Sequence, residues 1–404
     1  MKNMKNSHDP IKQIRFLSQT LSNDKKPLSF FLSAGCPLGV EMPEDKWPLI
    51  PAIKELSQKV NAELLNEDKV HLRYAEFIEE IKKDGKDHEN IELVLSFARS
   101  LTEVSIGGAV RGFSQEELIE LEKQICLIIA KLINVELPDE ITPYHKFASW
   151  IASIDREKAV EIFTTNYDLL MEQALEETSV PYFDGFVGAR NTFFDLRAIE
   201  ENAIPNHWTR LWKIHGSLNW YQSENAVHRS TGSNIQNQES HLIYPSHLKY
   251  DQSRKMPYLA LIDRLTSSIK KEPSVLISTG YSFNDEHIND SILNALKANP
   301  TSMVIALLFG NLSDYPRAEE IAKRRPNISL WAFDKAIIGT KKGDWQPVDD
   351  FEAEDNIGNV IKKEEKDDPE NPESKIISWK LTLGDFSRLG DFLQELVGNE
   401  NEEN

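Results

Sequence analysis

The sequence is poor in cysteine: Cys36 and Cys126 are the only two among 404 residues. Two thiols cannot form a disulfide framework, and they cannot supply the four thiolates of a structural zinc site. The fold must therefore depend on its apolar core, since 40% of the residues are hydrophobic. We expect no zinc in this protein.

Long apolar runs are also missing. The longest run, Met303 to Phe309, is far shorter than the roughly 20 residues that a membrane-spanning helix needs. The first residues, MKNMKNSHDPIKQIRF, are basic but contain no apolar stretch of the kind found in secretory signals. The sequence therefore predicts a cytoplasmic protein with no membrane association.

Positive charge is in deficit, with 46 lysines and arginines against 65 acidic residues and a formal net charge of -19. A field of this sign repels nucleic acid and anionic membranes at long range, so direct binding to nucleic acid is not expected. An anionic ligand would have to be held by local geometry.

Short apolar runs alternate with helical patterns along much of the chain. This alternation is typical of parallel strands joined by helical crossovers, and it predicts an α/β fold with a Rossmann-like parallel sheet and helices on both faces. The runs that we interpret as strands are 28–32, 161–165, 211–215, 275–280, 303–309 and 328–333.

A helical insertion is expected to interrupt this sheet domain. Residues 60–155 show helical periodicity and no strand pattern, so we assign the sheet domain to residues 1–59 and 156–345.

The remaining residues, 346–404, are predicted to form an acidic loop followed by a strand-helix extension. Residues 352–375 carry nine acidic against four basic side chains, a composition typical of a solvated loop. Residues 376–383 then alternate like a strand, and 386–396 repeat like a helix that folds back onto the body. The final GNENEEN is expected to be disordered.

Four of the predicted strands end in unusual residues: SAGCP (33–37), TTNYD (164–168), HGS (215–217) and GYSFND (280–285). Ligands bind at the carboxyl ends of the strands of open parallel sheets, where loops leave a crevice and helix N-termini point into it. These segments therefore predict a single site at one edge of the sheet.

Each segment also has a purely structural explanation. The small residues of SAGCP can bring backbone amides close to a pyrophosphate, but an Ala-Gly turn is also common without any ligand. Asn166 or Asp168 can cap the helix that follows, and Ser282 or Asn284 can cap the helix over 286–296. His287 fits a surface position.

His215 is the most informative of these residues. A lone histidine is more often structural than catalytic, but this one follows an apolar strand, precedes a glycine and shares the predicted edge with Asn166. An imidazole there can accept a proton near neutral pH.

Together the four segments resemble the sirtuin superfamily, and in particular its bacterial defence branch, the sirtuin-like NAD hydrolases. The resemblance covers residues 28–340, with the segments in the same order. Two departures are visible, because Ser33 and Pro37 replace a glycine and a serine of the family's phosphate loop. Within this branch the chain looks most like the subunit that pairs with a HerA-type hexameric ATPase, and LGDFSRLGDFL near the C-terminus adds to this likeness.

The resemblance implies that the protein acts on NAD, with Asn166 beside the nicotinamide ribose and His215 as the catalytic base. It also implies a set of residues that line the pocket for NAD. They are Ala34, Gly35, Cys36, Asp168, Gly216, Ser217, Gly280, Tyr281, Ser282 and Asp285.

Three functions follow from this likeness. The first is cleavage of NAD to nicotinamide and ADP-ribose, which would deplete NAD during anti-phage defence. The second is NAD-dependent protein deacylation, which the scarcity of cysteine disfavours because deacylating sirtuins carry a zinc module held by four cysteines. The third is a non-catalytic nucleotide-binding scaffold, which would not need Asn166 and His215. We expect a homo-oligomer that works with the ATPase.

Overall fold

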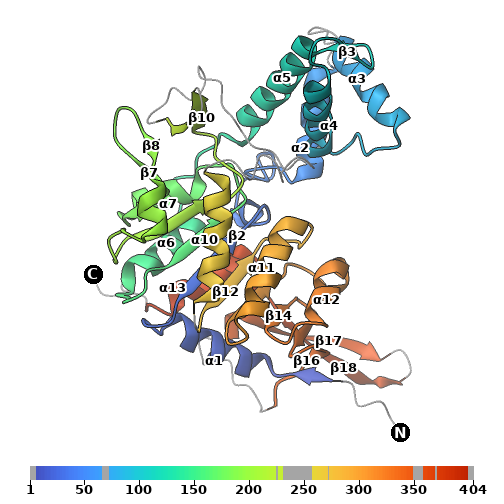
Figure 1. The fold of residues 1–404 in the computed structure, drawn as a ribbon. Helices are drawn as coiled ribbons and strands as arrows, with labels where there is room; N and C mark the ends of the chain where they lie inside the picture. The colour runs from blue at the N-terminus through green and yellow to red at the C-terminus, as the bar shows by residue number, and fades with distance from the viewer. Residues whose placement is uncertain are drawn as a thin grey trace.

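The computed structural model describes residues 6–65, 72–223, 226–230, 257–271, 273–348, 358–368 and 371–398, and the statements below concern these ranges. Its centre is one ten-stranded sheet (Figure 1). In spatial order the strands are β1 (Ser7–His8), β16 (Lys341–Trp345), β15 (Lys335–Ile338), β14 (Ile328–Trp331), β13 (Met303–Leu307), β12 (Val275–Thr279), β2 (Leu28–Leu32), β5 (Glu161–Thr164), β9 (Thr209–Lys213) and β6 (Tyr182–Phe183).

The strands from β14 to β6 run parallel to one another, as the sequence predicts. Every residue of β2 is buried, and its neighbours β12 and β5 pair with it along its length. A strand covered on both faces reads as a continuous apolar run, which is why LSFFL is recognisable in the sequence. The strands β15 and β16 extend the sheet as an antiparallel hairpin that the sequence analysis did not identify.

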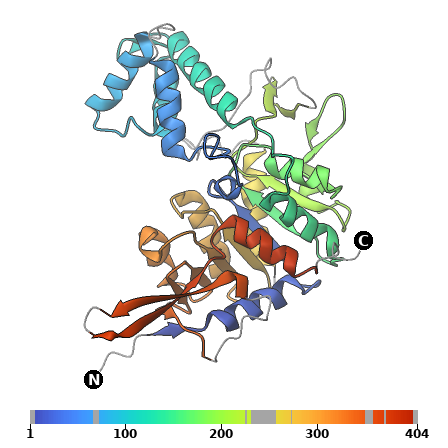
Figure 2. The same ribbon diagram turned by 180° about the vertical axis from the view of Figure 1, so that it is seen from behind.

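Helices cover both faces of the sheet. Phe30 points to one face and packs against Phe147, with ring centroids 4.8 Å apart, whereas Phe31 points to the other and packs against Tyr281 at 4.9 Å. The first face is covered by α1 (Pro10–Leu21), α6 (Pro143–Ser153), α7 (Leu170–Glu177) and α13 (Phe386–Glu395). The second is covered by α10 (Tyr258–Lys270), α11 (Glu286–Ala298) and α12 (Pro316–Ala322). Figures 1 and 2 show these two layers from opposite sides.

A separate helical unit stands beyond the carboxyl ends of the central strands (Figure 1). It contains α2 (Ile53–Leu64), α3 (Leu72–Lys83), α4 (Ile91–Val104) and α5 (Gln115–Ile133) around a core of its own. This core begins at Leu56 and ends at Ile133, apart from Leu218. The α6 helix belongs instead to the sheet core, so the compact unit is shorter at its C-terminal end than the 60–155 expected. It also holds a small hairpin, β3 (Ala109–Val110) with β4 (Phe113–Ser114), where no strand was expected.

Smaller elements surround the ends of β5 and β9. They are the helix α8 (Leu196–Glu200) and the two-stranded pairs β7 (Phe186–Val187) with β8 (Phe193–Phe194) and β10 (Trp220–Ser223) with β11 (Ala226–Arg229). Within the described ranges no helix combines the length and apolar character needed to cross a bilayer.

The acidic segment near the C-terminus corrects a prediction. Residues expected to form a solvated loop belong in part to a long antiparallel hairpin, β17 (Ile361–Asp368) with β18 (Asn371–Leu381), which projects from the body (Figure 2). Glu365 pairs with Lys375 across the hairpin at 3.0 Å and with Lys363 on its own strand at 2.9 Å, so like-charge repulsion is partly offset. The first part of the expected loop and most of GNENEEN lie outside the described residues.

The end of the chain folds back as expected. The α13 helix packs on α6, where the rings of Phe386 and Tyr144 are 5.0 Å apart, and Lys146 pairs with Asp391 at 2.5 Å. Gly384 lies against the end of β13, where a Cβ atom would come within 2.0 Å of the carbonyl oxygen of Leu308. Only glycine permits this close approach.

Candidate active site

A cavity of about 650 Å³ lies at the carboxyl ends of β2, β5, β9 and β12, which is the size range of small-molecule sites. All four predicted strand-end segments reach it. Further walls come from the helical unit and its connections, through 50–56, 90–93 and 129–133, and one residue comes from α12. The helical unit therefore forms one wall of a site that the sheet alone would leave more open.

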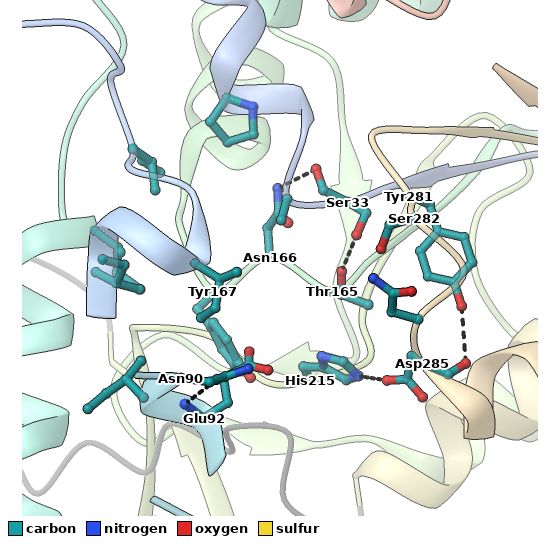
Figure 3. A pocket seen from close by; sticks show the side chains of 18 of the residues that line it. Ser33, Asn90, Glu92, Thr165, Asn166, Tyr167, His215, Tyr281, Ser282 and Asp285 are labelled. Atoms are coloured by element: carbon teal, nitrogen blue, oxygen red, sulfur yellow. Dashed lines mark hydrogen bonds and ion pairs between the residues drawn. The ribbon is translucent and has the colours of Figure 1, made fainter. Parts of the chain in front are cut away.

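The loops after β2, β5 and β12 are bonded to one another. Ser33 Oγ and Thr165 Oγ1 are 2.8 Å apart, and Asn166 Nδ2 donates to the carbonyl oxygen of Ser33 at 3.3 Å (Figure 3). On the other side, the amide of Gly35 donates to the carbonyl oxygen of Gly280 at 3.1 Å. These bonds fix Asn166 at the cavity wall.

The two glycines allow two backbones to touch. A Cβ atom on Gly35 would lie 2.7 Å from the Cα atom of Gly280, and one on Gly280 would lie 2.7 Å from the amide nitrogen of Cys36. Gly280 also has a φ of 68°, which favours glycine. Because the amides of Gly35 and Cys36 bond Gly280 and Ser33 within the protein, they are not the amides that would hold a phosphate, as the sequence analysis had supposed.

The loop after β5 is tied to β9 by a buried lysine. Lys213 is 1% exposed, and its ammonium group bonds Glu172 at 2.8 Å and the carbonyl oxygens of Tyr167 and Asp168. Burial raises the pKa of the Glu172 carboxyl, and Lys213 opposes that rise. In addition the amide of Leu218 donates to the carbonyl oxygen of Tyr167 at 2.9 Å.

His215 and Asp285 connect β9 with β12. Nε2 of His215 lies 3.3 Å from Oδ2 of Asp285, and both side chains are 14% exposed (Figure 3). The strands β5 and β2 lie between β9 and β12 in the sheet, so this contact bridges the crevice above them. Because a carboxylate only accepts hydrogen bonds, this contact favours the neutral tautomer with its hydrogen on Nε2, in which Nδ1 is the basic nitrogen.

Asp285 also caps α11, which corrects the expectation that Ser282 or Asn284 would do so. Its Oδ1 accepts from the amides of His287 and Ile288 at 3.0 and 3.2 Å, while Oδ2 faces His215. One carboxylate therefore fixes both the helix and the imidazole.

Neither Asn166 nor Asp168 is the N-cap of α7, because that position is held by Leu169, which makes no side-chain cap bond. Asp168 accepts from the amide of Leu170 at 3.1 Å, and burial raises the pKa of its carboxyl. Asn166 does not cap the helix but bonds Ser33, and it lines the same cavity as His215. Figure 3 shows both side chains at this cavity.

The predicted pocket residues fall into two groups. Those that line the cavity are Ala34, Asn166, Asp168, His215, Tyr281, Ser282 and Asp285. Those that lie behind its wall and shape the loops are Gly35, Cys36, Gly216, Ser217 and Gly280. Burial raises the pKa of the Cys36 thiol to about 12, so this side chain is an uncharged packing group at neutral pH.

Several lining residues were missed by the sequence analysis. Arg317 on α12 reaches the cavity and pairs with Glu286 at 2.5 Å, and His287, treated as a surface residue, lines the cavity as well. Glu92 and Tyr167 add a carboxylate and a phenol. No motif marks Arg317, since it comes more than thirty residues after GYSFND; only the packing of α12 beside α11 brings it there.

No group of three or more His, Cys, Asp or Glu side chains suited to holding a metal ion occurs in the described ranges. Cys36 lies in the core of the sheet domain and Cys126 in the core of the helical unit, and both are buried. The two thiols therefore cannot share a site.

Lys213 provides a test of how the loop carrying Asn166 is held. We expect Lys213→Met to destabilise the protein by about 3–5 kcal/mol, because it leaves Glu172 buried without its partner. Adding Glu172→Leu should recover part of this loss, as measured by urea unfolding. Lys82→Met, which breaks an exposed pair with Glu79, is the control and should change stability by less than about 1 kcal/mol. Equal losses of stability in Lys213→Met and Lys82→Met would contradict the role assigned to Lys213.

Comparison with known proteins gives a partial match. The SIR2-like domain family matches residues 160–329, which begin just before β5 and include TTNYD, HGS and GYSFND but not SAGCP. A search of curated proteins found no match. Over this part of the chain, the sequence is therefore similar to SIR2-like domains. This match supports a sirtuin-like relationship.

Proposed function

We propose that this protein hydrolyses NAD to nicotinamide and ADP-ribose. The observation that carries the proposal is that Asn166 and His215, from the ends of different strands, line one cavity together with Asp285. The match to SIR2-like domains covers all three residues. NAD is the substrate, and the cavity has room for its nicotinamide ribose beside these groups.

The reaction breaks the bond between C1′ of the ribose and the nicotinamide nitrogen, which takes the bonding electron pair and leaves as neutral nicotinamide. Positive charge develops on the ribose, so the site must orient the sugar, exclude bulk water and position one water molecule. That water forms the new bond to C1′ and loses one proton.

His215 is the proposed acceptor of that proton. Its Nδ1 is the basic nitrogen because Asp285 holds hydrogen on Nε2, and Asp285 stabilises the imidazolium that forms. Asp285 is therefore a positioning residue rather than a general base. Asn166, held by Ser33, would orient the ribose and the water through its amide group.

The pyrophosphate needs a cation that the loop after β2 does not provide. The charged side chains that line the cavity are mostly acidic, namely Glu92, Asp168, Asp285 and Glu286. Among the described residues that line the cavity, Arg317 is the only lysine or arginine. We therefore assign it to the phosphates. Its hydrogen bond to Glu286 raises the pKa of Arg317 and keeps the guanidinium at the rim.

Water is the favoured acceptor over an acyl-lysine. Apolar side chains of the helical unit, among them Ile91, Ile129 and Ile133, form one wall of the cavity. The two cysteines are buried in separate cores, so a four-cysteine module is absent. Both observations favour a closed site over a channel for a peptide.

The biological setting is part of the proposal. A protein that destroys NAD has to be restrained until it is needed, so we place its activity in anti-phage defence, within a homo-oligomer that works with a HerA-type hexameric ATPase. The helical unit and the projecting hairpin of β17 and β18 are the surfaces available for such assembly.

The central test uses His215→Ala and Asn166→Ala. Each should lower the rate of NAD cleavage by about 10²- to 10⁴-fold, because each removes a group proposed to act on the reacting ribose or water. Nicotinamide and ADP-ribose are measured by chromatography, with thermal unfolding as a check of the fold. His207→Ala, at the opposite end of β9, is the control and should stay fully active. Normal NAD cleavage by both variants would refute the proposal, and nicotinamide release only with an acylated peptide would favour deacylation.

Asp285→Asn separates helix capping from imidazole positioning. Asparagine caps helices as well as aspartate does, so the thermal unfolding temperature should hardly change. An amide group that donates toward Nε2 would move the ring hydrogen to Nδ1, so kcat should fall by about 10²-fold or more. Asp9→Asn, at the cap of α1, is the matched control. Full activity of Asp285→Asn would remove Asp285 from the mechanism.

Arg317→Gln tests the phosphate assignment. The KM for NAD should rise about tenfold while kcat changes little, since the guanidinium contacts the phosphates and not the reacting ribose. Arg324→Gln, which breaks an exposed pair with Glu320 outside the cavity, should leave both constants unchanged. A fall in kcat at constant KM would contradict this assignment.

A further inference from the structure

A second cavity, of about 450 Å³, lies at the other end of the same strands. Its walls include Leu28 at the start of β2, Glu161 at the start of β5 and Arg210 near the start of β9. The strands are five residues or shorter, so this cavity is about 17 Å from the first one along the strand direction. Nothing in the proposed NAD chemistry uses it.

The charge of this cavity is opposite to that of the protein. Its lining contains five basic side chains, Lys25, Lys158, Arg210, Arg264 and Lys271, against two acidic ones, Glu157 and Glu161. The lining therefore carries a formal charge of +3 (five minus two) in a chain whose net charge is -19. A local excess of this kind attracts anions despite the overall field.

Glu161 cannot neutralise the whole cluster, because its oxygens are already fully used. Oε1 accepts from Arg264 and from Lys271, each at 2.9 Å. Oε2 accepts from Arg264 at 2.8 Å and from the indole of Trp212 at 3.0 Å. Four donors occupy the four acceptor positions of one carboxylate, so no position remains for Arg210.

Arg210 is the least compensated charge in the cluster. It is 4% exposed, and burial lowers the pKa of its guanidinium. Among the described residues, no carboxylate lies within ion-pair distance of the Arg210 guanidinium. Arg210 donates to the carbonyl oxygen of Trp208 and, at a long 3.4 Å, to those of Ile204 and Asn206. A buried cation without a counter-ion is costly unless another anion compensates it.

A neighbouring arginine shows the difference between a structural charge and one left for a ligand. Arg156 also bonds backbone carbonyl oxygens, but it makes four such bonds, between 2.6 and 3.2 Å. It does not line the cavity. Arg156 therefore has its donors used by backbone carbonyl groups, whereas two of the three bonds of Arg210 are long, at 3.4 Å, and Arg210 lines the cavity.

We propose that this cavity binds a small phosphate-bearing anion. Arg210 would form the buried contact, and Lys158 and Lys271 the contacts at the rim, with the amide groups of Asn202 and Asn206 beside them. A planar guanidinium and two ammonium groups suit a phosphate, which offers several oxygens at once. The proposal does not depend on the function assigned to the first cavity.

The test uses inorganic pyrophosphate and ribose 5-phosphate as probes, which distinguish an inorganic anion from a sugar phosphate. Binding to the purified full chain is measured by calorimetry and by the rise in thermal unfolding temperature, at constant ionic strength. Lys158→Gln is the main variant because Lys158 is exposed, so this substitution should disturb the fold little. Arg210→Gln is the second, provided that it folds. Lys12→Gln, an exposed lysine on α1, is the matched control.

We expect Lys158→Gln to bind at least one probe about tenfold more weakly, while Lys12→Gln binds it as the wild-type chain does. Binding that is lost in Arg317→Gln but kept in Lys158→Gln would place the anion in the first cavity and overturn the proposal. The absence of binding by the wild-type chain to either probe would overturn it as well.

Discussion

The contact between His215 and Asp285 is the constraint on which the candidate site depends. It joins the loops after β9 and β12, two strands that are not neighbours and would lie about 14 Å apart in a flat sheet. Bonds between the other loops complete a closed ring around the cavity, from β12 to β2, from β2 to β5 and from β5 to β9. Each loop is therefore held on two sides, which gives the side chains facing the cavity a defined geometry.

The helical unit also helps to hold the loops that carry the candidate site. Leu218, three residues after His215, is buried in the core of the helical unit, and Tyr167, next to Asn166, packs against the same core. The two segments that carry the proposed chemistry are thus anchored at both ends, by their strands and by the insertion. A displacement of the insertion would therefore move the backbone beside both residues.

The parts of this protein that the sequence predicts are those set by local burial. The central strands appear as apolar runs because both of their faces are covered, and α1, α11 and α13 show their buried stripes. The hairpin of β17 and β18 was missed because the charged residues of β17 pair mostly with uncharged residues of β18, such as Glu365 with Ile377, which a count of acidic residues cannot reveal. Asp285 was read as a ligand contact and Arg317 was not noticed, since the first bonds a residue seventy positions away and the second reaches the cavity from another helix.

The two ends of the central strands also differ for a reason that lies in the fold. Helix N-termini and their free amides gather where parallel strands end, while helix C-termini and free carbonyl groups gather where the strands begin. The end where the strands stop therefore tolerates carboxylates: Asp285 accepts from two amides of the following helix, and Asp168 accepts from the amide of Leu170. The second end favours cations that donate to carbonyl oxygens, as Arg156 and Arg210 do. A chain with a net negative charge thus gathers basic side chains where its central strands begin. The positive charge that the carbonyl groups there do not compensate is available to an anion.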